Sequence, residues 1–324
     1  MKRRAFIAGL GGAAAWTVVA RAQPQPGIPV IGVLSGTSVS PPFAAFRKGL
    51  AEIGFTENQN VAIVHRWAEG RYEELPVLAA ELVKQQVAVI VATGGVQGAL
   101  AAKAATTSIP IVFANGSDPL SFGLVASLNR PGGNMTGVSF FTATLEGKRL
   151  GILHELVPAA APIAFQVNPG NPNADAQLKD VQVAAQTLGR HIVVFEARSE
   201  RDFDPAFSKM SQQRAGGLLV GSDPFFFISR RRIVELAAQH ALPAVYEWRE
   251  FVDAGGLASY GTNLAEAYRL AGVYAGKILK GEKPAELPVV QSTKFEFLIN
   301  LKTAKSLGLD VPPGLSARAD EVIE

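Results

Sequence analysis

Short apolar runs alternate along most of this chain with longer segments in which apolar residues recur at helical spacing. In the segment 43–53, for example, Phe43, Phe46, Leu50 and Ile53 fall on one helical face. The apolar runs are continuous, which is typical of parallel strands buried on both faces. In the first part of the chain, the pattern predicts strands at 28–34, 61–64, 87–92 and 109–113 and helices at 43–53, 75–83 and 96–105.

The same alternation resumes after a stretch rich in Gly and Pro near residues 131–137. The pattern there predicts strands at 163–167, 191–195, 217–220, 244–246 and 257–260, helices at 145–156, 174–188, 203–213, 233–240 and 265–279, and an extended stretch at 295–299. We therefore expect an α/β protein with two doubly wound parallel-sheet lobes of similar size, joined near residues 133–138.

The first 22 residues predict an export signal. Lys2, Arg3 and Arg4 form a basic head, residues 8–20 carry no charge, and a small-x-small cleavage site ends at Ala22. The uncharged run is shorter than the roughly 20 residues that span a bilayer. The adjacent arginines resemble the twin-arginine signal, with the general export route as the alternative. We expect a protein cleaved near Ala22 and located in the periplasm; a retained N-terminal anchor is the other interpretation.

Charge and composition exclude several classes of function. The formal net charge is +3, but four of the 31 basic residues and no acidic residue lie in the first 22 positions, so the remainder has a net charge of −1. A nucleic-acid partner, which requires a basic surface, is therefore not expected. The chain has no cysteine, which excludes disulfides, thiolate metal sites and a cysteine nucleophile.

The motifs of common enzymes are missing. The segment 137–141 approaches a nucleophile elbow but lacks its closing glycine, and the glycines at 94–98 are not followed by the Lys-Ser or Lys-Thr of a phosphate-binding loop. None of the four histidines has metal-ligand spacing. The sequence therefore predicts no catalysis, no cofactor and no metal.

A four-residue repeat follows two of the predicted strands. Gly-Ser-Asp-Pro occurs at 116–119 and again at 221–224, and Phe122 and Phe227 follow at the same distance. Asp before Pro is a favourable helix start, so both copies predict a helix. Such turns lie at the carboxyl ends of strands, where open α/β sheets bind ligands. The alternative is that both aspartates only cap helices.

Other loops after predicted strands are also rich in small polar residues, and aromatic residues accompany them. Backbone N–H groups at helix starts suit an anion, so this pattern predicts a cleft for a small ligand with an anionic end and an apolar body. The candidate ligand-binding residues are Ser35, Thr37, Thr93, Gly94, Asp118, Ser139, Asn168, Asp223, Tyr246 and Glu247. The accompanying aromatic residues are Phe140, Phe141, Phe225, Phe226, Phe227, Tyr246, Trp248 and Tyr260, for which core packing is the alternative.

Several longer strings resemble a known family. They include Ile109-Pro110-Ile111-Val112-Phe113, Arg130-Pro131-Gly132-Gly133-Asn134-Met135-Thr136-Gly137, Ser259-Tyr260-Gly261 and Asn300-Leu301-Lys302-Thr303-Ala304. From about Ile28 to its end, the chain resembles a substrate-binding protein of an ABC transporter, in the family that includes tryptophan- and tyrosine-binding periplasmic proteins.

The resemblance implies the type I periplasmic-binding fold, with two lobes, three crossing segments and a ligand between the lobes. It implies lobe 1 at 27–138 plus about 261–288, and lobe 2 at 139–260 plus about 289–324. It also implies a monomer that delivers its ligand to an ABC permease, without catalysis or a cofactor. An aromatic amino acid or an aromatic carboxylate is the expected ligand.

One departure leaves the ligand open. Members of the family often have a His-Pro or similar element after the first strand, where this chain has residues 36–42 of the sequence Gly-Thr-Ser-Val-Ser-Pro-Pro. Two other functions stay possible at this point. The same fold serves as a sensor module for a membrane receptor or kinase, and an exported α/β enzyme would require a reactive site that the sequence does not display.

Overall fold

The computed structural model describes residues 27–38, 42–140, 145–157, 161–292 and 294–324. The predicted export signal at 1–22 and Phe141 lie outside these residues. No helix in the described part of the chain is both long enough and apolar enough to cross a bilayer.

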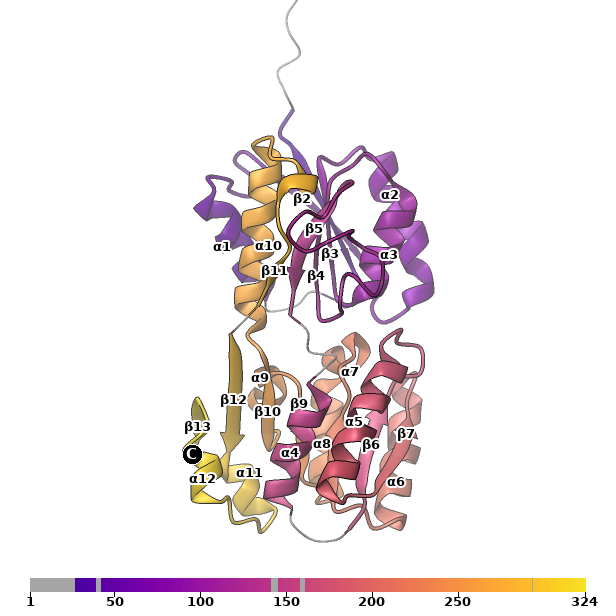
Figure 1. Cartoon of the computed structure of the whole chain (residues 1–324), viewed down its shortest axis with the longest axis vertical. Coiled ribbons are helices and arrows are strands. Elements are labelled where there is room, and N and C mark those ends of the chain that lie inside the picture. The colour runs from indigo at the N-terminus through magenta and orange to yellow at the C-terminus, as the bar shows by residue number, and fades with distance from the viewer. Residues whose placement is uncertain (1–26, 39–41, 141–144, 158–160, 293) are drawn as a thin grey trace, which may run out of the picture.

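The upper lobe in Figure 1, lobe 1, is a parallel sheet covered on both faces by helices. Its strand order is β11-β5-β4-β3-β1-β2, and every neighbouring pair is parallel. The strands are β1 Val30–Ser35, β2 Ala62–Trp67, β3 Val89–Thr93, β4 Ile111–Asn115, β5 Met135–Ser139 and β11 Val290–Gln291. Helices α1 Phe43–Glu52 and α10 Leu264–Leu279 cover one face, and α2 Leu75–Lys84 and α3 Val96–Ala105 cover the other.

The lower lobe, lobe 2, has a seven-stranded sheet in the order β13-β12-β10-β9-β8-β6-β7. The strands are β6 Ile163–Val167, β7 Ile192–Glu196, β8 Gly217–Val220, β9 Ala244–Tyr246, β10 Ala258–Thr262, β12 Phe295–Asn300 and β13 Glu321–Ile323. The helices are α4 Glu146–Leu156, α5 Ala174–Leu188, α6 Phe203–Gln212, α7 Pro224–Ile228, α8 Arg230–Gln239, α9 Arg249–Asp253, α11 Leu301–Ser306 and α12 Pro313–Ser316.

The predicted fold class is confirmed, with one change to the sheet of lobe 2. The extended stretch predicted at 295–299 is β12, which pairs with β10 in antiparallel orientation, so this sheet is mostly rather than wholly parallel. In both lobes the first five strands follow the same doubly wound order, 2-1-3-4-5. Ligands of such sheets bind outside the carboxyl ends of the strands, and here these two edges face each other.

The chain crosses between the lobes three times. It passes from β5 into α4, from β10 into α10, and from β11 into β12. The first two crossings are bonded together, since the Thr262 hydroxyl donates to the carbonyl oxygen of Phe140 at 2.9 Å. A hinge of three chain segments therefore joins the lobes.

The helix pair on the hinge side of lobe 1 packs unusually closely because glycines line its contact. A Cβ at Gly49 would lie 1.9 Å from the backbone oxygen of Arg269, and one at Gly272 would lie 2.1 Å from that of Phe46. Only glycine allows the backbones of α1 and α10 to approach this far. Together with Phe43 and Leu50, this contact forms the core between the two helices and the sheet.

The predicted link at residues 133–138 is wrong, because most of it is strand β5. Met135–Ser139 is buried throughout and pairs with β4. Gly137 lies opposite Phe113, where a Cβ would approach the Phe113 carbonyl oxygen to 2.1 Å. Glycine in a strand can mark such a close backbone approach as well as a turn, and the sequence pattern does not separate the two.

The two copies of the Gly-Ser-Asp-Pro repeat have different structures. Asp223 caps α7 as predicted and accepts hydrogen bonds from the N–H groups of Phe225 and Phe226. Asp118 does not begin a helix; its carboxylate accepts from Leu120 N in a turn that ends at Gly123, whose φ is +61°. The second copy is followed by three phenylalanines that bury in the core, and this packing stabilises a helix of only five residues.

Candidate functional site

A cleft between the lobes brings together the loops at the carboxyl ends of both sheets. The space between these loops is about 590 Å³, a figure that includes the open solvent at the mouth of the cleft. It is lined from both lobes by Thr37, Gly94, Gly95, Gln97, Gly116, Ser117, Phe140, Asn171, Asn173, Ser222, Asp223, Pro224, Phe227, Glu247, Trp248, Leu264 and Tyr268.

Lobe 1 contributes a rigid polar rim. The Ser35 hydroxyl lies 3.0 Å from that of Thr37 and accepts a hydrogen bond from Thr37 N at 3.2 Å, which fixes the loop after β1. Gly94 and Gly95 have φ values of +64° and +105°, and they turn the chain from β3 into α3. Because Gly94, Gly95 and Gln97 line the cleft, the N-terminus of α3 opens on it, where a helix favours negative charge.

Asp223 anchors the opposite wall, in lobe 2. Its carboxylate is 2% exposed and accepts hydrogen bonds from Asn168 Nδ2 at 3.2 Å, Asn171 Nδ2 at 2.8 Å and the N–H groups of Phe225 and Phe226. Burial nevertheless raises the pKa of Asp223 to about 6, against these hydrogen bonds. The cleft therefore has at this point an acid that is held in place by many donors.

A second acid, Glu247, lies at the end of β9 and is also 2% exposed. Burial raises its pKa well above the usual range, and the positive charge of Arg149 opposes this shift. Arg149 itself forms an ion pair with Glu146 at 2.7 Å, and both side chains are fully buried. The hydroxyl of Ser222 links this pair to the cleft, because it accepts from Arg149 Nη2 at 2.8 Å and donates to Glu146 Oε1 at 3.1 Å.

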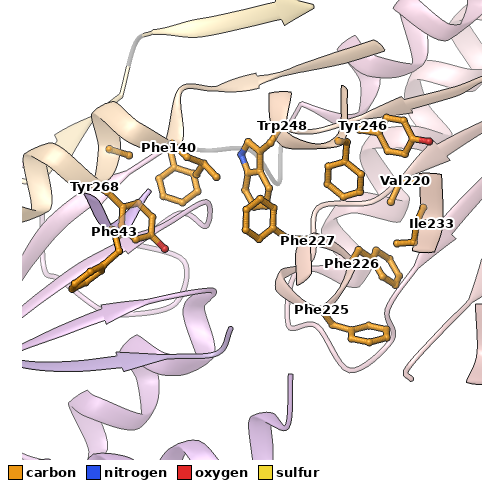
Figure 2. Close-up of a cluster of buried hydrophobic side chains, with 14 of the residues drawn as sticks. Phe43, Phe140, Val220, Phe225, Phe226, Phe227, Ile233, Tyr246, Trp248 and Tyr268 are labelled. Atoms are coloured by element: carbon orange, nitrogen blue, oxygen red, sulfur yellow. The ribbon is translucent and has the colours of Figure 1, made fainter. Parts of the chain in front are cut away.

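Between these polar walls the cleft is aromatic. Phe140, Phe227 and Trp248 project into the space between the lobes, and Tyr268 approaches from lobe 1 (Figure 2). The Phe227 and Trp248 rings meet edge to face, with centroids 5.0 Å apart. Burial raises the pKa of Tyr268 to about 12, and the Thr93 side chain is its hydrogen-bonding partner. An apolar wall of this kind suits a flat, apolar ligand body.

Hydrogen bonds cross the cleft in this structure. Tyr72, on the lobe 1 side, donates its hydroxyl to Asp223 Oδ1 at 3.4 Å and accepts from Phe225 N at 3.2 Å. Asn173 of lobe 2 donates to the hydroxyl of Ser117 in lobe 1 at 2.8 Å. Because these contacts join the rims of the two lobes, the structure represents a closed arrangement.

The structure sorts the ten residues predicted from the sequence into three groups. Four line the cleft: Thr37, Gly94, Asp223 and Glu247. Four lie behind it, and each is bonded to a residue that lines it: Ser35 to Thr37, Thr93 to Tyr268, Ser139 to the backbone of Ser117, and Asn168 to Asp223. The last two do not reach it: Asp118 forms its own turn, and Tyr246 stacks on Phe251 in the core of lobe 2 at 4.7 Å.

Sequence reasoning missed other residues of the cleft. Asn171 and Asn173 lie in the loop after β6, and its run of asparagines, glycine and prolines was a signal that could have found them. Gln97 lies in the first turn of α3, close to glycines that were singled out. Leu264 and Tyr268 belong to α10, far away in sequence, and only the second crossing of the chain brings them to the cleft.

The side chains that line the cleft are suited to holding a small molecule. Among the residues that the structure describes, no group of three or more His, Asp or Glu side chains could hold a metal ion. The described residues that line the cleft include two acids, several neutral hydrogen-bonding groups and an aromatic wall. This set can hold a small amphipathic molecule by its polar end and its ring.

Comparisons with known proteins agree on one kind of protein. A family model described as ABC transporter substrate binding protein matches residues 27–323. A tyrosine-binding protein of Clostridioides difficile (strain R20291) is 26% identical over 264 residues, which cover 82% of this chain and 75% of that protein.

Two solved structures cover nearly the whole fold. One is the ABC domain in complex with L-Trp from Streptococcus pneumonia, with a TM-score of 0.81, 26% identity and coverage of 91% of this chain and 99% of that one. The other is a conserved domain protein from Vibrio cholerae, with a TM-score of 0.82, 25% identity and the same coverage of both chains. The neighbours in fold include periplasmic binding proteins, so the two-lobed architecture is the type I periplasmic-binding fold.

Proposed function

The chain belongs to the ABC transporter substrate-binding protein family, and on this basis we propose that it captures an aromatic amino acid or an aromatic carboxylate and delivers it to a membrane permease. It is a binding protein by family, and in this proposal the ligand leaves the cleft chemically unchanged.

The observation that carries the proposal is the aromatic cleft with polar groups at its walls. Phe140, Phe227, Trp248 and Tyr268 offer ring faces and edges from both lobes, while Asp223 and the N-terminus of α3 offer hydrogen-bonding partners. Such a combination recognises a ring and a polar head group in one molecule. The ligands named for the two relatives, tyrosine and L-Trp, have this chemistry.

Capture works in this proposal by closure about the hinge. Ligand contacts made only in the closed form shift the population from open to closed. A shift from 1:99 to 99:1 needs about 5.5 kcal/mol of differential binding free energy. A hydrogen bond to a charged group contributes about 1.5–3 kcal/mol, so two or three contacts of a head group supply enough.

The wider setting completes the proposal. We place the protein in the periplasm as a monomer, after cleavage near Ala22, with an ABC permease as its partner. The lobes are proposed to follow the expected ranges, 27–138 plus about 261–288 and 139–260 plus about 289–324, except that Ser139 and Val290–Gln291 are assigned to lobe 1, since β5 and β11 belong to its sheet. Since Val290 and Gln291 pair with β5, the third crossing between the lobes follows directly after them.

A ligand screen tests the proposal. Purified protein is titrated with L-tryptophan, L-tyrosine, L-phenylalanine, aromatic carboxylates and sugars while its thermal unfolding is followed, because a ligand that binds only the folded state raises the melting temperature. We expect stabilisation by aromatic ligands, together with a smaller radius of gyration in solution scattering. Binding of sugars alone, or saturation without any compaction, would contradict the proposal.

A further inference from the structure

The acidic and basic side chains that line the cleft are all acidic in the described part of the chain. Asp223 and Glu247 line it, and both are 2% exposed. No lysine, arginine or histidine is present among the described residues that line the cleft. A bound carboxylate would therefore meet two buried acids with no basic side chain in direct reach.

Arg149, whose positive charge acts on Glu247, is already engaged. It pairs with Glu146 at 2.7 Å, donates to the Ser222 hydroxyl at 2.8 Å and donates to the carbonyl oxygen of Tyr260 at 3.2 Å. Glu146 in turn accepts from the backbone N–H of Ser222 at 3.1 Å. The pair is neutral as a whole and binds the loop before Asp223 to α4, so it leaves the excess negative charge of the cleft in place.

The two acids of the cleft differ in how they are satisfied. Asp223 accepts hydrogen bonds from Asn168, Asn171, Tyr72 and two backbone N–H groups. Neither carboxylate oxygen of Glu247 has a partner in good hydrogen-bond geometry, although the Ser222 hydroxyl lies close enough to lower its pKa. That hydroxyl donates its proton to Glu146 Oε1 at 3.1 Å, so Glu247 is poorly satisfied compared with Asp223.

Four charged or titratable side chains interact electrostatically with Glu247. They are Arg149 and Glu146 on α4, Asp223 on the neighbouring β8–α7 turn, and Tyr72 of lobe 1, whose pKa Glu247 raises. Of these groups only Arg149 is a cation. A buried acid without hydrogen bonds is costly, and a ligand that donates to it removes that cost.

From this arrangement we infer that a cationic amine on the ligand binds the Glu247 carboxylate and is the group that the site requires. The inference rests on the proposed function and narrows its ligand class. Aromatic amino acids and aromatic amines are ligands, and aromatic carboxylates without an amine are not. The carboxylate of an amino acid then lies toward the N-terminus of α3, where its contribution is smaller.

Six commercial probes separate the amine from the ring. L-Tryptophan, tryptamine and indole-3-propionate share one ring; L-leucine, 3-methylbutylamine and 4-methylpentanoate repeat the same head groups on an aliphatic body. By calorimetry we expect tryptamine to bind within about 30-fold of L-tryptophan. Indole-3-propionate is expected to bind at least about 100-fold more weakly, because it leaves Glu247 unpaired and adds a like charge.

A matched pair of variants tests the residue. Glu247→Gln should weaken L-tryptophan about 10- to 100-fold and leave indole-3-propionate unchanged or improved. Glu250→Gln is the control, since Glu250 is a half-buried acid three residues further on, with one unpartnered carboxylate oxygen, and it does not line the cleft. This control should retain the affinities of the unsubstituted protein.

Proton release gives a readout that a structural role of Glu247 would not produce. Because burial raises the pKa of Glu247, its protonated form is favoured relative to that of a free carboxyl group, and an ammonium group that binds the carboxylate displaces the proton. Calorimetry at pH 6 in two buffers of different ionisation enthalpy should detect protons released by tryptamine. The release should be smaller in Glu247→Gln and unchanged in Glu250→Gln.

The outcomes distinguish this inference from the proposed function. If indole-3-propionate binds as tightly as L-tryptophan, the amine requirement is overturned and the aromatic function stands. If the leucine series binds and the tryptophan series does not, the aromatic function fails. The amine requirement is then decided by whether L-leucine and 3-methylbutylamine bind more tightly than 4-methylpentanoate. Failure of all six probes overturns both. Should Glu247→Gln not fold, the probe order and proton release of the unsubstituted protein decide.

Discussion

Replacing Tyr72 by Phe isolates the free energy of lobe closure, because the Tyr72 hydroxyl makes its hydrogen bonds across the cleft. It donates to Asp223 Oδ1 at 3.4 Å and accepts from Phe225 N at 3.2 Å. After the change, Phe225 N keeps its bond to Asp223 Oδ1 at 2.8 Å, so no backbone donor is left unpaired. What is lost is one long hydrogen bond to a charged acceptor, about 1 kcal/mol.

This loss falls on the closed form alone, since in the open form water solvates the Tyr72 hydroxyl. About 1 kcal/mol lowers the ratio of closed to open protein about fivefold. Where the closed form is the minor one without ligand, apparent affinity is divided by the same factor. We therefore expect Tyr72→Phe to bind L-tryptophan about fivefold more weakly by calorimetry, with little change in the free energy of unfolding.

Tyr274→Phe is the matched control, because the Tyr274 hydroxyl donates to the Pro288 carbonyl oxygen at 2.7 Å within lobe 1. It should lose about 1 kcal/mol of unfolding free energy and keep its affinity. Equal affinities for Tyr72→Phe and the unsubstituted protein would refute the view that this hydroxyl favours closure. So would an equal weakening by both variants, which would trace the effect to general stability.

Three further predictions concern packing, pH and buried charge. Gly272→Ala should lower the unfolding free energy measured with urea by about 1–3 kcal/mol, because its Cβ would meet a backbone oxygen of α1 at 2.1 Å. Gly151→Ala, whose Cβ would have nothing within 4 Å, should raise it by about 0.5–1 kcal/mol, and equal effects of the two changes would refute the packing argument. The pKa of Asp223 is about 6 in the fold and 3.8 without it, so its contribution to stability is full below about pH 4 and is lost as pH rises through 6. The unfolding free energy of the unsubstituted protein minus that of Asp223→Asn should accordingly fall by up to about 3 kcal/mol between pH 4 and 7, and a flat difference would count against the raised pKa. Arg149→Met should cost about 3–5 kcal/mol by leaving Glu146 charged and buried, and the double variant with Glu146→Gln should recover most of it; no recovery would show that packing, not charge, causes the loss.

The regular elements of this protein could be predicted from sequence because their signals are local. Continuous apolar runs indicated β1, β3, β4, β6 and β8, and helical spacing indicated α1 and α10. Where the same local signal serves two structures, prediction failed. Gly137 indicated a link but lies in β5, and Asp118 has the helix-start motif of Asp223 without a helix after it.

The candidate site likewise has a part that the sequence predicts and a part that it does not. Strand-end loops are recognisable in the sequence, and Thr37, Gly94, Asp223 and Glu247 were found by that rule. Whether a loop residue faces the cleft, supports a neighbour or packs in the core depends on side-chain direction, which separates Glu247 from the adjacent Tyr246.

The sequence by itself determined the doubly wound lobes and the loops at their strand ends, since hydrophobic periodicity and turn residues act over a few positions. Only the tertiary structure decided which residues meet across the cleft, because three crossings bring α10 against loops far away in the chain. The tertiary structure also decided which charged side chains are paired and which one remains at the cleft. Arg149 and Glu146 neutralise each other inside lobe 2, and a carboxylate is left without a partner where a ligand would bind.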